Sequence, residues 1–142
     1  NQYNEQKKIV SKIREVFFDA KGINVLFISS KEEKYKRKVC ETVKEIYKKW
    51  NKKIGTSELN RWFSSIWETG SNQKIPGSLK FKYIAQNKIR PPTFNIYHNK
   101  NSKVPKVAKR YIINRIREKF GLEGIPIRIN LMTSKNPFNN KN

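Results

Sequence analysis

Leu79-Lys80-Phe81-Lys82-Tyr83 alternates apolar and basic residues along the chain. A period of two is typical of a β-strand that buries one face and exposes the other to water. On this pattern Lys80 and Lys82 lie together on the wet face. The stretch therefore predicts a half-buried strand, and the elements around it decide the fold.

Helices and further strands are expected on both sides of this strand. The sequence predicts, in order, a helix from Thr56 or Ser57, a loop over 69–78, the strand above, a strand around 94–97, a helix from Pro105 to Phe120 capped by Gly121, and a strand over 127–131. The order from residue 56 is α-β-β-α-β, which indicates a compact α+β domain over 55–138, with a disordered tail over 139–142.

The first third of the chain has a different pattern. Apolar residues recur at helical spacing over 6–17 and again over about 32–51, and residues 23–28 are nearly all apolar, as in a strand buried on both faces of a parallel sheet. One such strand needs a neighbouring strand on each side, and the sequence predicts no other strand close to it. We therefore interpret residues 1–54 as a helix-strand-helix remnant of a larger α/β domain.

Charge dominates the composition. The chain carries 32 Lys and Arg against 11 Asp and Glu, a formal net charge of +21, which attracts polyanions such as nucleic acid. A low-GC genome would also enrich lysine, so composition alone leaves both explanations open. Six of the eight arginines lie beyond residue 60, and the planar fork of arginine suits phosphate. The placement of the arginines therefore favours a phosphate-binding function over genome bias.

The helix that follows Pro105 carries the most specific pattern of charge. At about 100° per residue, Ala108, Ile112, Ile116 and Phe120 form a buried stripe, and Lys106, Arg110, Asn114 and Arg117 form a stripe beside it. Three cations and an amide in line can follow a phosphate backbone. An ordinary solvated helix face is the alternative. The predicted RNA-binding residues are Lys80, Lys82, Arg90, Lys106, Arg110, Asn114, Arg117 and Arg128.

Other residues that could carry chemistry have simpler interpretations. Trp50, Trp62 and Trp67 fall at buried helical spacings, so we expect core packing rather than base stacking. Gly121-Leu122-Glu123-Gly124 matches the G-x-x-G clamp of KH domains, yet its place between a helix and a strand favours a turn. Cys40 and His98 are the only cysteine and histidine, which argues against a disulfide and against a zinc site.

Several function classes have no counterpart in the sequence. It contains no phosphate-binding loop, nucleophile elbow or metal-ligand pair at helical spacing, so no catalytic or metal-binding residue is predicted. No apolar run approaches the roughly 20 residues that span a bilayer, and no signal peptide precedes the first helix. We expect a soluble cytoplasmic protein without a membrane partner.

The motifs of the second part, taken together, resemble the carboxy-terminal end of EngA (Der), a family of bacterial GTPases with two tandem GTPase domains and a KH-like domain. The resemblance covers about residues 55–138. It rests on Thr56-Ser57-Glu58-Leu59-Asn60-Arg61-Trp62, Leu79-Lys80-Phe81-Lys82-Tyr83-Ile84-Ala85-Gln86, Arg90-Pro91-Pro92-Thr93-Phe94, Arg110-Tyr111, Asn114-Arg115-Ile116-Arg117-Glu118, Phe120-Gly121, Gly124-Ile125-Pro126-Ile127-Arg128 and Asn136-Pro137-Phe138.

The resemblance implies a KH-like domain preceded by the end of the second, P-loop GTPase domain. It implies an RNA-binding and coupling module in late maturation of the large ribosomal subunit, with that subunit, its rRNA and the upstream GTPase domains as partners. GTP and Mg²⁺ belong to the parent protein, and this chain alone holds neither. Ser29, Ser30 and Lys31 correspond to the family's guanine-base loop but lack its glycine. The alternative is an intramolecular regulatory domain that docks on the GTPase domains without touching RNA.

Overall fold

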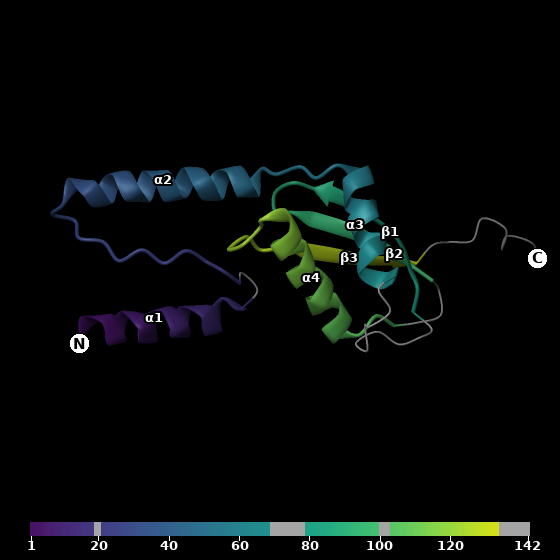
Figure 1. The fold of residues 1–142 in the computed structure, drawn as a ribbon, viewed down its shortest axis with the longest axis horizontal. Helices are drawn as coiled ribbons and strands as arrows, with labels where there is room; N and C mark the ends of the chain where they lie inside the picture. The colour runs from purple at the N-terminus through teal and green to yellow at the C-terminus, as the bar shows by residue number, and fades with distance from the viewer. Residues whose placement is uncertain (19–20, 69–78, 100–102, 134–142) are drawn as a thin grey trace, which may run out of the picture.

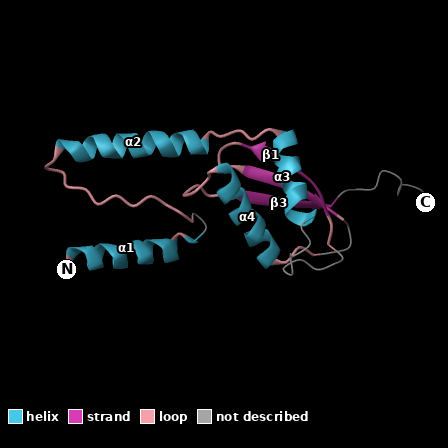
Figure 2. Ribbon diagram, in the orientation of Figure 1, coloured by secondary structure: helices cyan, strands magenta, loops and turns pink. Residues whose placement is uncertain are grey.

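The computed structural model describes residues 1–18, 21–68, 79–99 and 103–133. The described elements are α1 (Gln2–Val16), α2 (Glu33–Trp50), α3 (Thr56–Glu68), β1 (Phe81–Lys88), β2 (Thr93–His98), α4 (Lys106–Phe120) and β3 (Arg128–Thr133). Figures 1 and 2 show α1 and α2 extending away from a small body formed by the other five elements. The loop predicted over 69–78 and the tail predicted over 139–142 lie outside the described residues.

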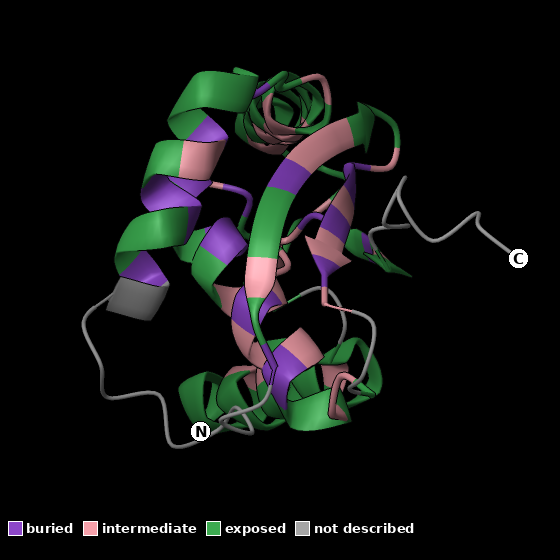
Figure 3. Cartoon of the chain, turned by 90° about the vertical axis from the view of Figure 1, so that its right-hand side faces the viewer, coloured by how far each residue is buried: buried purple, intermediate pink, exposed green. Residues whose placement is uncertain are grey.

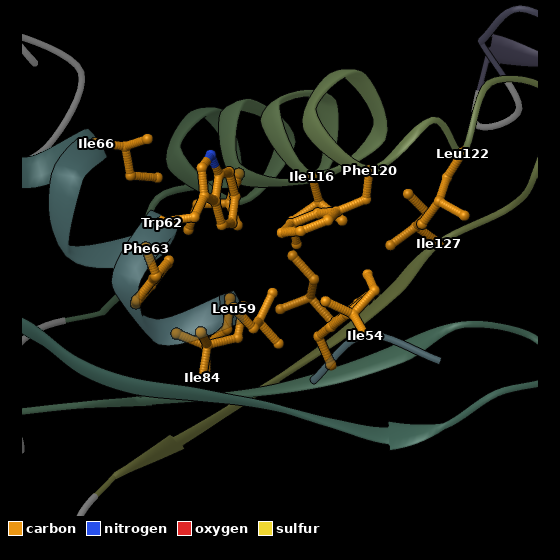
Figure 4. Packing of buried hydrophobic residues seen from close by; sticks show 14 of the residues in the cluster. Ile54, Leu59, Trp62, Phe63, Ile66, Ile84, Ile116, Phe120, Leu122 and Ile127 are labelled. Carbon is orange, nitrogen blue, oxygen red and sulfur yellow. The ribbon is translucent and has the colours of Figure 1, made fainter. Parts of the chain in front are cut away.

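The sheet confirms the predicted order of elements. Its strands lie in the order β1-β2-β3, with β1 antiparallel to β2 and β2 parallel to β3. The parallel pair requires a crossover, which α4 supplies. Both α3 and α4 lie on one face of the sheet (Figures 1 and 4). The result is an α+β domain of two layers, as the sequence indicates.

The core fills the space between those two helices and the sheet. Trp62 of α3 meets Phe120 of α4 edge-on, with ring centroids 5.2 Å apart (Figure 4). Each fully buried aliphatic or aromatic side chain contributes roughly 1.5–3 kcal/mol of hydrophobic stabilisation. The buried cluster consists of Ile54, Leu59, Trp62, Phe63, Ile66, Ile84, Phe94, Ile96, Ile112, Ile116, Phe120, Leu122, Ile125, Ile127 and Ile129.

Strand β1 departs from the predicted alternation at one point. It begins at Phe81 and runs to Lys88, and its pairing with β2 shifts register between Phe81 and Tyr83. Such a bulge turns the side chains that follow to the other face. Tyr83 is therefore exposed and Ile84 is fully buried, the reverse of what a regular strand predicts. Lys80 and Lys82 are exposed, as expected.

The end of α4 forms as predicted. Gly121 takes the left-handed conformation at φ 64° and ψ 44°, and the Leu122 N–H donates to the Arg117 carbonyl at 2.9 Å. This closure leaves Leu122 fully buried. The G-x-x-G stretch is thus a turn that caps a helix, as the sequence favours.

The first third contains both predicted helices, but the strand predicted over 23–28 is wrong. Within the described segment 21–68, these residues run without strand pairing. The physical reason is that a lone strand has no neighbour to accept its backbone hydrogen bonds. The segment instead crosses between α1 and α2 as an extended connection (Figure 1).

The apolar stripes of α1 and α2 are also more exposed than predicted. Neither helix contains a buried residue (Figure 3). Val16 and Tyr47 are 69% and 61% exposed. A stripe is buried only where another element covers it. The core position expected for Trp50 is therefore wrong, whereas that of Trp62 is confirmed; the Trp67 side chain lies outside the described residues.

Candidate nucleic-acid interface

Helix α4 separates its apolar and polar side chains as predicted. Ala108, Ile112, Ile116 and Phe120 are all buried, which confirms the core stripe. On the adjoining side Lys106 and Arg110 are exposed and Asn114 is half-buried. The first two of these side chains can reach a ligand that approaches from water.

A groove of about 390 Å³ follows this side of α4. We call it the α4 groove; its described lining residues are Phe18, Lys21, Lys106, Lys109, Arg110, Ile113, Asn114, Arg117 and Ile127. Five of these side chains are cationic, and none of the described lining residues is a carboxylate. The structure therefore brings four of the eight predicted RNA-binding residues into one basic groove. A groove with one sign of charge concentrates ligands of the opposite sign.

A second hollow of about 430 Å³ continues from the α4 groove toward α1. It shares Phe18, Lys21, Asn114 and Arg117 with the groove, and Arg14, Phe17, Gly22, Glu118 and Glu123 line the rest. The two glutamates give this end a mixed charge. Glu118 pairs with Arg115 at 3.3 Å and Glu123 with Lys49 at 3.7 Å. A polyanion is therefore attracted most strongly toward the Lys106 end.

Arg117 does not lie on a solvated stripe, and this part of the prediction is wrong. The residue is only 3% exposed. Its Nη2 donates to the Ile125 carbonyl at 3.3 Å, and its Nη1 donates to Asn114 Oδ1 at 3.2 Å. Helix projection places it beside Asn114, but the turn after Gly121 folds back over it. The guanidinium thus ties that turn to α4, and contact with RNA through Arg117 stays untested.

The other predicted cations lie outside the α4 groove. Lys80 and Lys82 are exposed next to and within β1, and Arg90 is exposed in the turn between β1 and β2, before a cis peptide bond to Pro91. Arg128 is exposed at the start of β3. Four residues that seemed equivalent in the sequence are thus distributed around the sheet.

The turn before α2 carries the predicted guanine-loop residues. The Lys31 N–H donates to Ser29 Oγ at 3.4 Å, while Ser30 and Lys31 are exposed. None of the three lines the α4 groove, and Figure 1 shows this turn at the far end of α2 from the sheet. A guanine contact by Ser29, Ser30 and Lys31 stays a prediction.

Sequence reasoning missed five groove residues, Phe18, Lys21, Lys109, Ile113 and Ile127. The first two follow α1, more than 80 positions before α4 in the sequence, and no periodicity joins them to it. One signal was available, because Arg14, Phe17, Phe18 and Lys21 interleave basic and aromatic residues. That composition is typical of surfaces that bind single-stranded nucleic acid.

The described residues provide neither a membrane-spanning helix nor a cluster of metal ligands. None of the described helices combines the length and the apolarity needed to cross a membrane. Across the same ranges, no three His, Cys, Asp or Glu side chains gather where they could hold a metal ion.

Comparison with known proteins gives matches along most of the chain. Residues 53–131 match the family described as KH-domain-like of EngA bacterial GTPase enzymes, C-terminal. The chain is 41% identical over 120 residues to GTPase Der of Rickettsia bellii (strain OSU 85-389), covering 83% of this chain and 26% of that protein. It is 40% identical to GTPase Der of Rickettsia typhi, with 83% and 27% covered. The chain thus spans about a quarter of the length of these relatives.

Proposed function

Because the chain belongs to the EngA family of bacterial GTPases through its C-terminal KH-like domain, we propose that it is an RNA-binding and coupling module of a GTPase in late large-ribosomal-subunit biogenesis. The parent protein acts in the cytoplasm and binds GTP and Mg²⁺ through domains that precede this region. The rRNA of the large subunit is the polyanion that this module contacts.

The α4 groove is the observation that supports RNA binding. Lys106 and Arg110 are exposed on its wall, and Lys21 and Lys109 add charge within the same groove. No Asp or Glu occurs between Glu68 and Glu118, so the surrounding sequence does little to neutralise these cations. A low-GC genome enriches glutamate codons as well as lysine codons. Base composition alone therefore does not account for an acid-free span that contains six of the nine described groove residues.

Coupling to the upstream domains is supported by the contact between the two parts of the chain. The Gly124 N–H donates to the Lys21 carbonyl at 2.9 Å, and Lys52 Nζ donates to the Phe120 carbonyl at 2.8 Å. The first bond joins the first third to the turn after α4, and the second joins it to the last residue of α4. A movement of the segment before α2 therefore displaces one wall of the α4 groove relative to the other.

Salt dependence of rRNA binding tests the proposal. Each phosphate neutralised on a single strand contributes about −0.7 to the slope of log affinity against log salt concentration. Replacing two groove cations, Lys106→Ala with Arg110→Ala, is expected to flatten the slope by about 1.4. Lys38→Ala with Lys44→Ala, on the exposed face of α2, removes the same charge elsewhere and is the matched control. Equal slopes for the two double variants would refute the α4 groove as the RNA contact.

A second function is favoured by the exposed apolar stripes of α1 and α2. Such stripes pack on other protein surfaces, so the region could act as a regulatory domain that docks on the GTPase domains without touching RNA. Absence of rRNA affinity at low salt for residues 1–142, together with binding to the preceding GTPase domains, would support this function instead. Affinity for rRNA that falls with salt would support the first.

A further inference from the structure

The sheet has a second face, which no described helix covers. Both α3 and α4 lie on the core side (Figure 4), and on the opposite side the register aligns Tyr83 of β1, Tyr97 of β2 and Met132 of β3 in one row. Tyr83 is 43% and Met132 41% exposed. The tyrosine rings are neighbours, with centroids 5.9 Å apart and planes tilted by 53°. A pair of aromatic rings, with Tyr83 exposed and Tyr97 half-buried, therefore occupies this open face.

The next row across the same face is polar. The register places Ala85, Asn95 and Asn130 side by side, and Asn130 Nδ2 donates to Asn95 Oδ1 at 3.0 Å. Arg128 lies two positions before Asn130 on β3, so it is on the same side of the strand, and it is exposed. Aromatic rings, amides and a guanidinium thus adjoin one another.

The charge of this face selects the kind of partner. None of the three strands contains an aspartate or a glutamate, whereas Lys82, Lys88 and Arg128 are all exposed on them. A protein partner would need carboxylates to pair with these cations. A nucleic-acid strand supplies both phosphates for the cations and aromatic bases for the tyrosine rings. Base stacking on aromatic side chains tolerates any base because every base has a π-face. Sheets that expose aromatic rings bind unpaired RNA bases in this way in other folds.

We propose that the open sheet face is a base-stacking platform, on which Tyr83 and Tyr97 hold one or two unpaired bases of single-stranded RNA. This inference rests on the proposed RNA-binding function and adds a contact on the opposite side of the sheet from α4. The α4 groove attracts phosphates through its five cationic side chains. The platform requires bases, and the amides of Asn95 and Asn130 lie next to the edges of any base that stacks there.

The test compares two oligonucleotides on the chain 1–142. One is a ten-nucleotide single-stranded RNA, and the other is an abasic strand with the same number of phosphates. The wild-type chain is expected to bind the base-containing strand at least about fivefold more tightly, because one stacked base is sufficient for that factor. Tyr83→Ala with Tyr97→Ala should abolish the preference, and Tyr83→Phe with Tyr97→Phe should retain it because the rings remain.

Controls separate stacking from folding and from charge. Tyr3→Ala with Tyr47→Ala removes two tyrosines that are 60% and 61% exposed on α1 and α2, and should keep the preference. Nitration of wild-type tyrosines adds a readout that needs no variant. The base-containing strand should protect Tyr83 and Tyr97 from nitration more than the abasic strand does, with Tyr3 and Tyr47 modified equally in both.

The outcomes distinguish this inference from the proposed function. Equal affinity of the wild-type chain for both strands would overturn the platform and leave RNA binding intact. Absence of affinity for either strand would overturn both. A preference that survives in the alanine variant would place base recognition elsewhere, and unchanged tyrosine nitration with bound RNA would indicate a protein partner for this face; either result contradicts the proposal.

Discussion

Gly22 and Gly124 pack backbone against backbone where the first third of the chain meets the turn after α4. A Cβ atom built on Gly124 would lie 3.1 Å from the Gly22 carbonyl oxygen, and one on Gly22 would lie 2.9 Å from Glu123 Cβ. Both glycines have positive φ, 87° and 75°. Only glycine combines that conformation with so close an approach. The two parts of the chain therefore meet at a point where neither tolerates a side chain.

Gly124→Ala is expected to lower stability by more than the cost of its left-handed conformation. That cost is roughly 1–2 kcal/mol, and the collision with Gly22 adds to it. Gly121→Ala is the matched control, because Gly121 also has positive φ but has nothing within 4 Å of an added Cβ. Urea unfolding of both variants measures the difference in free energy of unfolding. Equal losses would contradict a close approach at Gly124.

Arg117→Ala is expected to act on stability rather than on the salt dependence of RNA binding. The substitution leaves the Ile125 carbonyl without this buried donor, and an unsatisfied buried group costs about 1–3 kcal/mol. Arg115→Ala is a suitable control, since its ion pair with Glu118 is exposed and contributes less than about 1 kcal/mol. Urea midpoints and rRNA salt slopes are measured for both variants. A flattened slope in a fully stable Arg117→Ala chain would restore Arg117 to the phosphate-binding residues.

Periodicity in the sequence predicts the elements of the KH-like body but not the details that set its surfaces. The stripe from Ala108 to Phe120 needs only the geometry of one helix, and it is confirmed. The exposure of Tyr83 depends on a bulge, which arises from pairing with β2 and has no local signature in the alternating sequence. The burial of Arg117 depends on a turn that closes after the helix ends.

The same limit applies to the candidate site. Lys106 and Arg110 belong to one helix, and their common side follows from a period of 3.6 residues. Phe18 and Lys21 join them through tertiary contacts, among them the bond from the Gly124 N–H to the Lys21 carbonyl. The strand expected over 23–28 fails for a related reason: its apolar composition favours a buried strand, but strand formation needs partners that local sequence does not specify.

Asn60→Asp is expected to destabilise the edge of the sheet. Asn60 Oδ1 accepts the Ile84 N–H at 3.0 Å, and Asn60 Nδ2 donates to the Ile84 carbonyl at 2.8 Å, so one amide satisfies both backbone groups of an edge-strand residue. A carboxylate of the same shape keeps the first bond and loses the second, at a cost of about 1–3 kcal/mol. The measurement is the free energy of unfolding. Asn87→Asp, exposed on the same strand, controls for the added charge, and equal effects would refute the amide cap.

Gln86→Glu is expected to loosen the connection between α2 and α3 without unfolding the domain. Gln86 Oε1 accepts the Ile54 N–H at 2.7 Å, and its Nε2 donates to the Lys52 carbonyl at 3.1 Å. A glutamate retains an oxygen that accepts the Ile54 N–H. Its second oxygen, however, replaces the amide donor and repels the Lys52 carbonyl oxygen. Ile54 anchors the connection because its side chain is buried in the core. We therefore expect the loosening to stay local to the connection.

Hydrogen exchange measures this loosening at single amides. Exchange at the Ile54 amide should accelerate in Gln86→Glu, because the repulsion at Lys52 favours opening of the connection. The Leu59 amide, which donates to the Gly55 carbonyl at 2.9 Å within the first turn of α3, should exchange at its original rate. Acceleration at both amides would indicate global destabilisation. Unchanged exchange at Ile54 would show that the connection is held by the burial of its side chain rather than by Gln86, and the link from α2 to the sheet would then be apolar in origin.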